Sequence, residues 1–158
     1  MSWVAAAADT THDLDGVFGL LPEAYERFRA LYESLWESAV LEPSILDMCR
    51  LRIAALMGLD AIDSEPGTIA PSLAADKLAT LPRYATSPLF STCERACIAF
   101  AEQYVLDPHA LTDEDFARLR EHLDDKQIAT LTLAAAVFDA TTRFELALGI
   151  TPHGSVLR

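Results

Sequence analysis

The chain has 158 residues, a length that fits one domain with its own hydrophobic core. Hydrophobic residues make up 51% of the chain and charged residues 23%, a balance that argues against intrinsic disorder. The 24 acidic and 12 basic residues give a formal net charge of −12, which argues against partners that need a basic face, namely nucleic acids and anionic membrane surfaces.

The N-terminal stretch and the cysteines bear on localisation. Residues 1–9 hold no Lys or Arg, and their apolar run is shorter than the roughly 7–15 residues of a signal-peptide core. No stretch approaches the ~20 apolar residues of a membrane span. An odd number of cysteines without a signal peptide favours reduced thiols, so we expect a cytoplasmic protein. We interpret residues 1–20 as an N-terminal arm and residues 21–158 as one helical domain.

Two helices are expected in the first third of the chain. The first begins at Pro22, a residue favoured in the first turn, and carries one wide apolar face. That face is formed by Tyr25, Phe28, Leu31, Tyr32, Leu35 and Trp36. The second runs from Pro43 to Gly58 and is apolar nearly all round, which is typical of a buried helix.

Asp47, Arg50 and Arg52 interrupt this second helix. A buried charge without a partner is very costly, so each of the three needs one. Asp47 and Arg50 are three residues apart, a spacing at which helical side chains can pair. They form either a structural ion pair or a pocket acid that is oriented by an arginine.

Later helices are marked by their starting residues. Residues 59–65 could form a short helix that Pro66 ends, and 71–81 predicts another. Capping signals follow at Ser91–Glu94, Thr112–Asp115 and Asp124–Gln127. The last begins a helix that ends before Gly149 with a seam of Ile128, Leu131, Ala135, Phe138, Thr142 and Leu146. No segment alternates with period two, so we predict an all-α fold.

Several stretches resemble one family. Leu51-Arg-Ile-Ala-Ala-Leu-Met-Gly58 resembles the core segment of the carboxymuconolactone decarboxylase/alkylhydroperoxidase D-like family. Residues 87–102, 112–116 and 128–150 resemble later parts of it, in the family's order. The resemblance implies a single-domain helical bundle with the alkylhydroperoxidase D-like fold. It also implies a homo-oligomer, because family members assemble as dimers, trimers or hexamers.

The family's redox members carry Cys-x-x-Cys at a helix start, a His four residues later and a Glu twelve residues before the first Cys. A helix N-terminus and a His/Glu relay lower the thiol pKa, and the second thiol forms the disulfide. Here Leu59 and Ile62 occupy the Cys positions, Pro66 the His position and Asp47 the Glu position. Neither Leu nor Ile can form a thiolate, so these residues argue against thiol peroxidase activity.

Two other thiols are candidates for redox chemistry. Cys93 and Cys97 lie one helical turn apart on the same face, and Cys93 falls in the first turn, where the helix dipole lowers a thiol pKa. Their Cβ atoms point the same way along the helix, so a disulfide between them would strain it. We interpret them as one core residue and one partly exposed thiol, and Cys49 as inert.

The remaining polar residues predict no metal or cofactor. Asp60, Asp63 and Glu65 form an acidic cluster whose spacing matches no calcium loop, and we interpret it as a solvated turn. The four histidines have no metal-ligand spacing and are expected on the surface. They are His12, His109, His122 and His153.

Three functional hypotheses follow from these observations. The first is a family member that has lost the redox thiols. The second is an acid–base decarboxylase or lyase for a small organic acid or lactone, in which Asp47 moves a proton and Arg50 or Arg52 binds a carboxylate. The third is a non-catalytic binding or assembly protein in which Leu59 and Ile62 line an apolar ligand pocket.

Overall fold

The computed structural model describes residues 14–59 and 73–150. These two ranges contain helices and no strand, which confirms the all-α prediction. The α-helices are α1 (Leu14–Phe18), α2 (Pro22–Glu37), α3 (Pro43–Leu56), α4 (Ala75–Thr80), α5 (Thr92–Leu106), α6 (Asp113–Arg120) and α7 (Asp125–Leu148). Two 3-10 turns, η2 (Leu81–Arg83) and η3 (Pro108–Ala110), lie between them. None of these helices is both long and apolar enough to cross a bilayer.

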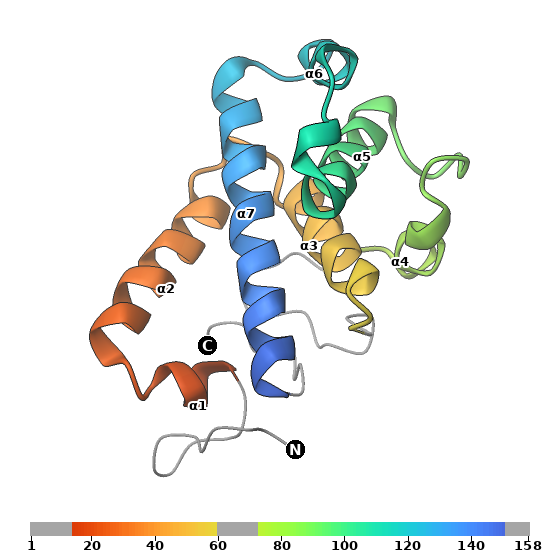
Figure 1. Ribbon diagram of the computed structural model, residues 1–158. Coiled ribbons are helices and arrows are strands. Elements are labelled where there is room, and N and C mark those ends of the chain that lie inside the picture. Colours follow the sequence, from red (N-terminus) through yellow and green to blue (C-terminus); the bar gives the residue numbers. More distant parts are fainter. Residues whose placement is uncertain (1–13, 60–72, 151–158) are drawn as a thin grey trace.

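The long helix α7 runs through the middle of the molecule (Figure 1). It passes between α2 on one side and α3 and α5 on the other, and it contacts all three. The core lies where these helices meet and is closed by fully buried side chains such as Leu46, Ile53, Ile98 and Leu131. Because α3 packs on both α5 and α7, the expectation of a helix buried on most sides is confirmed.

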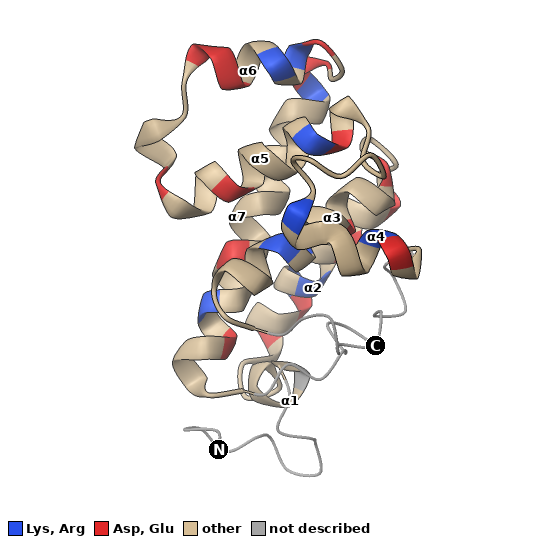
Figure 2. Ribbon diagram, turned by 90° about the vertical axis from the view of Figure 1, so that its right-hand side faces the viewer, with Lys and Arg blue, Asp and Glu red and all other residues tan. Residues whose placement is uncertain are grey.

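Polar caps fix where the three C-terminal helices begin. The side chains of Ser91, Thr112 and Asp124 each accept a hydrogen bond from the backbone amide three residues on. The side chain of that third residue in turn accepts a hydrogen bond from the backbone amide of the capping residue. Helix α6 carries acids in its first turn and arginines in its last, as Figure 2 shows. This arrangement favours the helix because it opposes the helix dipole.

Glycines end two of the core helices, α3 and α7. Gly58 follows α3 with a φ of +79°, and Gly149 follows α7 with a φ of +62°. In both cases the backbone amide after the glycine donates a hydrogen bond to a carbonyl of the last helical turn. Leu59 donates to Ala54 at 3.0 Å, and Ile150 donates to Glu145 at 2.9 Å. Both ends confirm the positions expected from the sequence.

Three details differ from the predictions. Part of the expected N-terminal arm is helix α1, whose Leu14 and Val17 are buried against Ile150. Helix α4 begins later than expected, because Ala74 has an extended backbone and caps the helix instead of lying inside it. On α7 the buried seam was expected to include Leu146, which is 43% exposed. The buried residue at this point is Glu145, which is 8% exposed.

The helix period explains the error on α7. At about 3.6 residues per turn, Glu145 lies about 20° from Phe138 around the helix, whereas Leu146 lies about 80° away. The residue that continues the line from Leu131 through Phe138 is therefore the acid. A carboxylate thus lies in the apolar seam near the end of α7.

Candidate functional site

Asp47 lies in the middle of α3 and is almost completely buried, with 3% of its surface exposed. Arg50 donates to the same oxygen of Asp47 from Nε at 3.0 Å and from Nη2 at 2.6 Å, which confirms the expected pair. Burial raises the pKa of Asp47, and the neighbouring Arg50 opposes that shift. At the position that the sequence resemblance matches to the family's relay Glu, the chain therefore holds a carboxylate that already accepts hydrogen bonds from Arg50.

A second carboxylate faces the same arginine. Burial raises the pKa of Glu145 to about 7, and the charge of Arg50 opposes part of that rise. Tyr32 of α2 completes the group; burial raises its pKa to about 12, and both Asp47 and Glu145 add to the shift. Helices α2, α3 and α7 thus bring two acids and a phenol within electrostatic reach of one guanidinium, and we call Tyr32, Asp47, Arg50 and Glu145 the buried acid cluster.

Neither Glu145 nor Tyr32 was among the site residues expected from the sequence. Glu145 follows Leu131 and Phe138 at intervals of seven, and a Glu in that register could have been recognised as a buried acid. Tyr32 was expected on the apolar face of α2, and it is indeed buried there. Its position beside the charges depends on how α2 packs against α7, which local sequence does not show.

Arg52 does not join this cluster. It lies two residues after Arg50 and so on the other side of α3, where its Nε donates to Glu102 of α5 at 2.8 Å and its Nη2 donates to the same carboxylate oxygen. The hydroxyl of Tyr84 donates to the second oxygen of Glu102, and the Arg52 guanidinium lies 5.8 Å from the centre of the Tyr84 ring. We call these three residues the Arg52 network. Arg50 and Arg52 thus serve separate acids.

The positions that correspond to the family's redox residues are only partly covered. Leu59 is half-buried and packs against the hydrophobic core directly after the end of α3. Ile62 and Pro66 lie outside the described residues, as do Asp60, Asp63 and Glu65 of the acidic turn. At the position that the sequence resemblance matches to the first redox Cys, an aliphatic side chain packs against the core.

None of the three cysteines forms a disulfide, and all three are poorly suited to nucleophilic chemistry. Cys49 and Cys97 are fully buried, and burial raises the pKa of Cys49 to about 12 and that of Cys97 higher still. Cys93 was expected to have a lowered pKa at the start of α5. Its pKa is raised, because partial burial and the nearby carboxylates of Glu94 and Glu42 outweigh a hydrogen bond from Cys97.

The histidines within the described ranges lie on the surface, as predicted. His109 belongs to η3 and His122 follows α6, and both are exposed. His12 and His153 fall outside those ranges. Across the part of the chain that the structure describes, no group of three or more His, Cys, Asp or Glu side chains is arranged to hold a metal ion.

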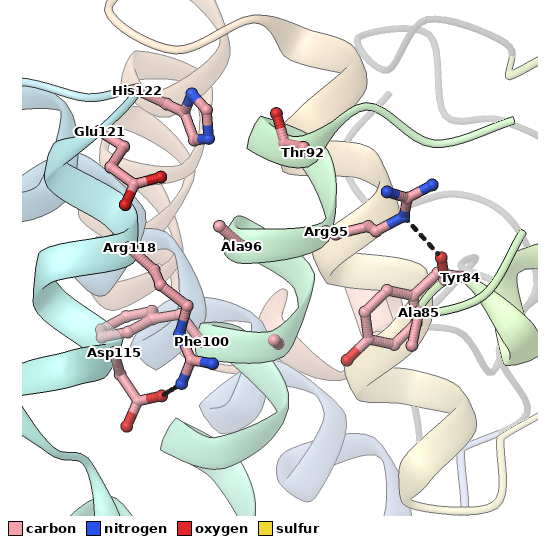
Figure 3. Close-up of a pocket in the computed structure, with 11 residues that line it drawn as sticks. Tyr84, Ala85, Thr92, Arg95, Ala96, Phe100, Asp115, Arg118, Glu121 and His122 are labelled. Atoms are coloured by element: carbon pink, nitrogen blue, oxygen red, sulfur yellow. Dashed lines mark hydrogen bonds and ion pairs between the residues drawn. The ribbon is translucent and has the colours of Figure 1, made fainter. Parts of the chain in front are cut away.

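A pocket of about 360 Å³ lies between α5, α6 and the turn that precedes α5 (Figure 3). Its lining includes Ala96 and Phe100 on α5, with Arg118 on one side and Arg95 and Tyr84 on the other. The sequence analysis did not anticipate it, because the residues come from two helices and a turn. Tyr84 contributes both to this pocket and to the Arg52 network.

Comparison with known proteins establishes the fold. The crystal structure of an Agrobacterium tumefaciens protein of unknown function, described as a candidate antioxidant defence protein AhpD, matches with a TM-score of 0.66 and 20% identity over 81% of this chain and 89% of that one. A peroxidase-related protein of Ralstonia eutropha with an alkylhydroperoxidase AhpD core matches with a TM-score of 0.65 and 19% identity, over 90% and 80% of the two chains. The chain has the alkylhydroperoxidase D-like fold. This confirms the fold that the sequence resemblance implied.

One curated relative is detected from sequence. YnjA, an uncharacterised protein of Escherichia coli K12, is 28% identical over 116 residues, which is 72% of this chain and 64% of YnjA. The chain therefore spans less than two thirds of the length of this relative. No family model matches the sequence.

Proposed function

We propose that this chain is a member of the carboxymuconolactone decarboxylase/alkylhydroperoxidase D-like family that does not reduce peroxides through thiols. The fold and the ordered resemblance to the family support the membership. The observation that carries the loss of redox chemistry is Leu59, an aliphatic residue packed against the core at the position matched to the first redox Cys. The second position, Ile62, is aliphatic as well.

The chain's own thiols give no substitute pair. A peroxidatic thiol must be a thiolate that peroxide can reach, and burial keeps Cys49 and Cys97 protonated and covered. Cys93 is the most accessible of the three, but its nearest thiol is Cys97, one turn further along the same helix. A disulfide between them would strain α5.

The test measures peroxide consumption with dithiothreitol as reductant, using hydrogen peroxide and cumene hydroperoxide. We expect wild type to match a variant in which Cys49, Cys93 and Cys97 are all serine. Thiol-dependent turnover that disappears in Cys93→Ser or Cys97→Ser would refute the proposal. A second variant, Leu59→Cys with Ile62→Cys, tests the positional equivalence: oxidation should join the two new thiols, seen as a mass loss of two hydrogens.

A second candidate is an acid–base decarboxylase or lyase for a small organic acid or lactone. The buried acid cluster favours it, because a carboxyl group with a pKa of about 7 can both give and take a proton at neutral pH. Arg50 would orient a carboxylate, and Glu145, not only Asp47, would move the proton. Turnover of keto acids or lactones that survives both Glu145→Gln and Asp47→Asn would remove this candidate.

We also propose that the protein forms a homo-oligomer, as the family resemblance implies. Several large apolar side chains are exposed on the chain alone, which is consistent with surfaces that a second copy covers. They include Leu20, Leu21, Leu31, Leu133 and Leu146. Light scattering coupled to size-exclusion chromatography measures the mass directly, and a monomer mass at micromolar concentration would contradict the proposal.

A further inference from the structure

The pocket between α5 and α6 has the volume and the apolar lining of a small-molecule site. Its volume of about 360 Å³ lies in the range of roughly 300–1,000 Å³ that is typical of ligand pockets. Ala96, Ala99 and Phe100 form an apolar floor along α5. The Phe100 ring is held edge-on against Phe116 with ring centres 5.6 Å apart, so this part of the floor is fixed before any ligand arrives.

Arg95 at one end of the pocket is a partly buried cation without a carboxylate partner among the described residues. Its Nη2 donates to the carbonyl of Ser87 at 2.8 Å, and its Nε donates to the carbonyl of Tyr84 at 3.3 Å. A guanidinium has five N–H donors, so main-chain contacts use two and leave others for an acceptor. A partly desolvated positive charge held only by neutral groups attracts an anion.

The other charges of the pocket do not cancel this preference. Asp115 is already engaged: it accepts from Arg118 at 2.5 Å and from the amide and hydroxyl of Thr112. These hydrogen bonds, led by those from Thr112, lower the pKa of Asp115. Glu121 is exposed, so water screens its charge far more than the charge of Arg95 is screened.

We propose that this pocket binds a small organic carboxylate with a compact apolar body. The carboxylate accepts hydrogen bonds from Arg95, and the apolar body covers Ala96, Ala99 and the ring of Phe100. Figure 3 shows Arg95 beside Tyr84 on one side of α5, with Ala96 and Phe100 between it and α6. The site shares no residue with the buried acid cluster, so it stands whether or not that cluster is catalytic.

Benzoate and its neutral isostere benzamide are the probes. Isothermal titration should detect benzoate binding to the purified full chain, and benzamide should bind at least about tenfold more weakly because it lacks the charge-assisted hydrogen bond. Equal affinity for the two compounds would overturn the proposal. Absence of benzoate binding at millimolar concentration would overturn it as well.

Two pairs of variants locate the site. Ala99→Leu should abolish benzoate binding by filling the pocket, whereas Ala117→Leu, at an exposed position of α6 outside the pocket, should leave it unchanged. Glu121→Gln should lower the dissociation constant of benzoate about two- to fivefold, because it removes an exposed negative charge that repels the carboxylate. Asp125→Asn changes the net charge equally at a side chain that is 92% exposed and lies outside the pocket, and it should have no such effect.

Folding of each variant can be checked independently of benzoate binding. Ala99 and Glu121 are exposed, so their replacement should preserve the helical circular dichroism spectrum and the unfolding midpoint. If benzoate binding survives Ala99→Leu in a folded variant, the ligand lies elsewhere and the proposal is wrong. If Glu121→Gln weakens benzoate binding, the carboxylate does not bind in this pocket and the proposal is wrong.

Discussion

Helix α3 carries one group of charged residues on each of two opposite sides, and the two groups differ in their ratio of acidic to basic side chains. On one side Arg50 bonds directly to Asp47 and lies within electrostatic reach of a second carboxylate, that of Glu145. On the other side Arg52 faces one carboxylate, Glu102, whose remaining oxygen is occupied by the Tyr84 hydroxyl. The first group has more negative than positive charge, and the second is matched one to one.

The difference shows how burial and hydrogen bonding together determine how well a carboxylate is stabilised inside this fold. Burial raises the pKa of Glu145, and Arg50, which donates hydrogen bonds to Asp47, only partly opposes that rise. In the Arg52 network each of the two oxygens of the Glu102 carboxylate accepts a hydrogen bond from a side-chain donor. Three changes, from the largest expected effect to the smallest, test this contrast.

Arg50→Met should have the largest effect on stability. It leaves two buried carboxylates without a cation, and breaking a buried pair in this way costs about 3–5 kcal/mol. The cost should be greater at pH 8 than at pH 5, because both acids can take up protons at the lower pH. Urea unfolding at the two pH values measures it, and an equal cost at both would show that the cluster does not bind protons as described.

Glu145→Gln should stabilise the protein at pH 8. The folded-state pKa of Glu145 is raised from 4.5 to about 7, so its contribution to stability is complete below pH 4.5 and is lost as the pH rises to about 7. The amide mimics the neutral acid and should remove this loss, a gain of up to about 3 kcal/mol at pH 8. Glu114→Gln, at a side chain that is 80% exposed, is the control and should not change the pH profile.

Arg52→Met should cost about 2 kcal/mol, because it removes charge-assisted hydrogen bonds from a carboxylate that is still 18% exposed. A double-mutant cycle with Glu102→Gln isolates the pair, and the double variant should lose less than the sum of the single changes. Additive losses would mean that Arg52 stabilises the fold through packing on Tyr84 rather than through Glu102.

Local sequence predicted the helices well and the site only in part. Capping residues such as Ser91 and Asp124 mark a helix start within four residues, and the Asp47–Arg50 pair lies within one turn, so both could be recognised. Arg52 and Glu102 are 50 residues apart, and their pairing depends on how α3 and α5 pack. The pocket also depends on packing, since no single segment contains enough of its lining to predict it.

The fluorescence of Trp36 can report on the buried acid cluster. Its indole is 5% exposed and lies 6.0 Å from the ring of Tyr32 and 5.9 Å from that of Phe138, in a rigid aromatic group beside the charges. Indole emission depends on the electric field around the ring, so ionisation of Glu145 should shift the colour of Trp36 fluorescence near neutral pH. The fold therefore carries its own optical indicator of whether that proton is present.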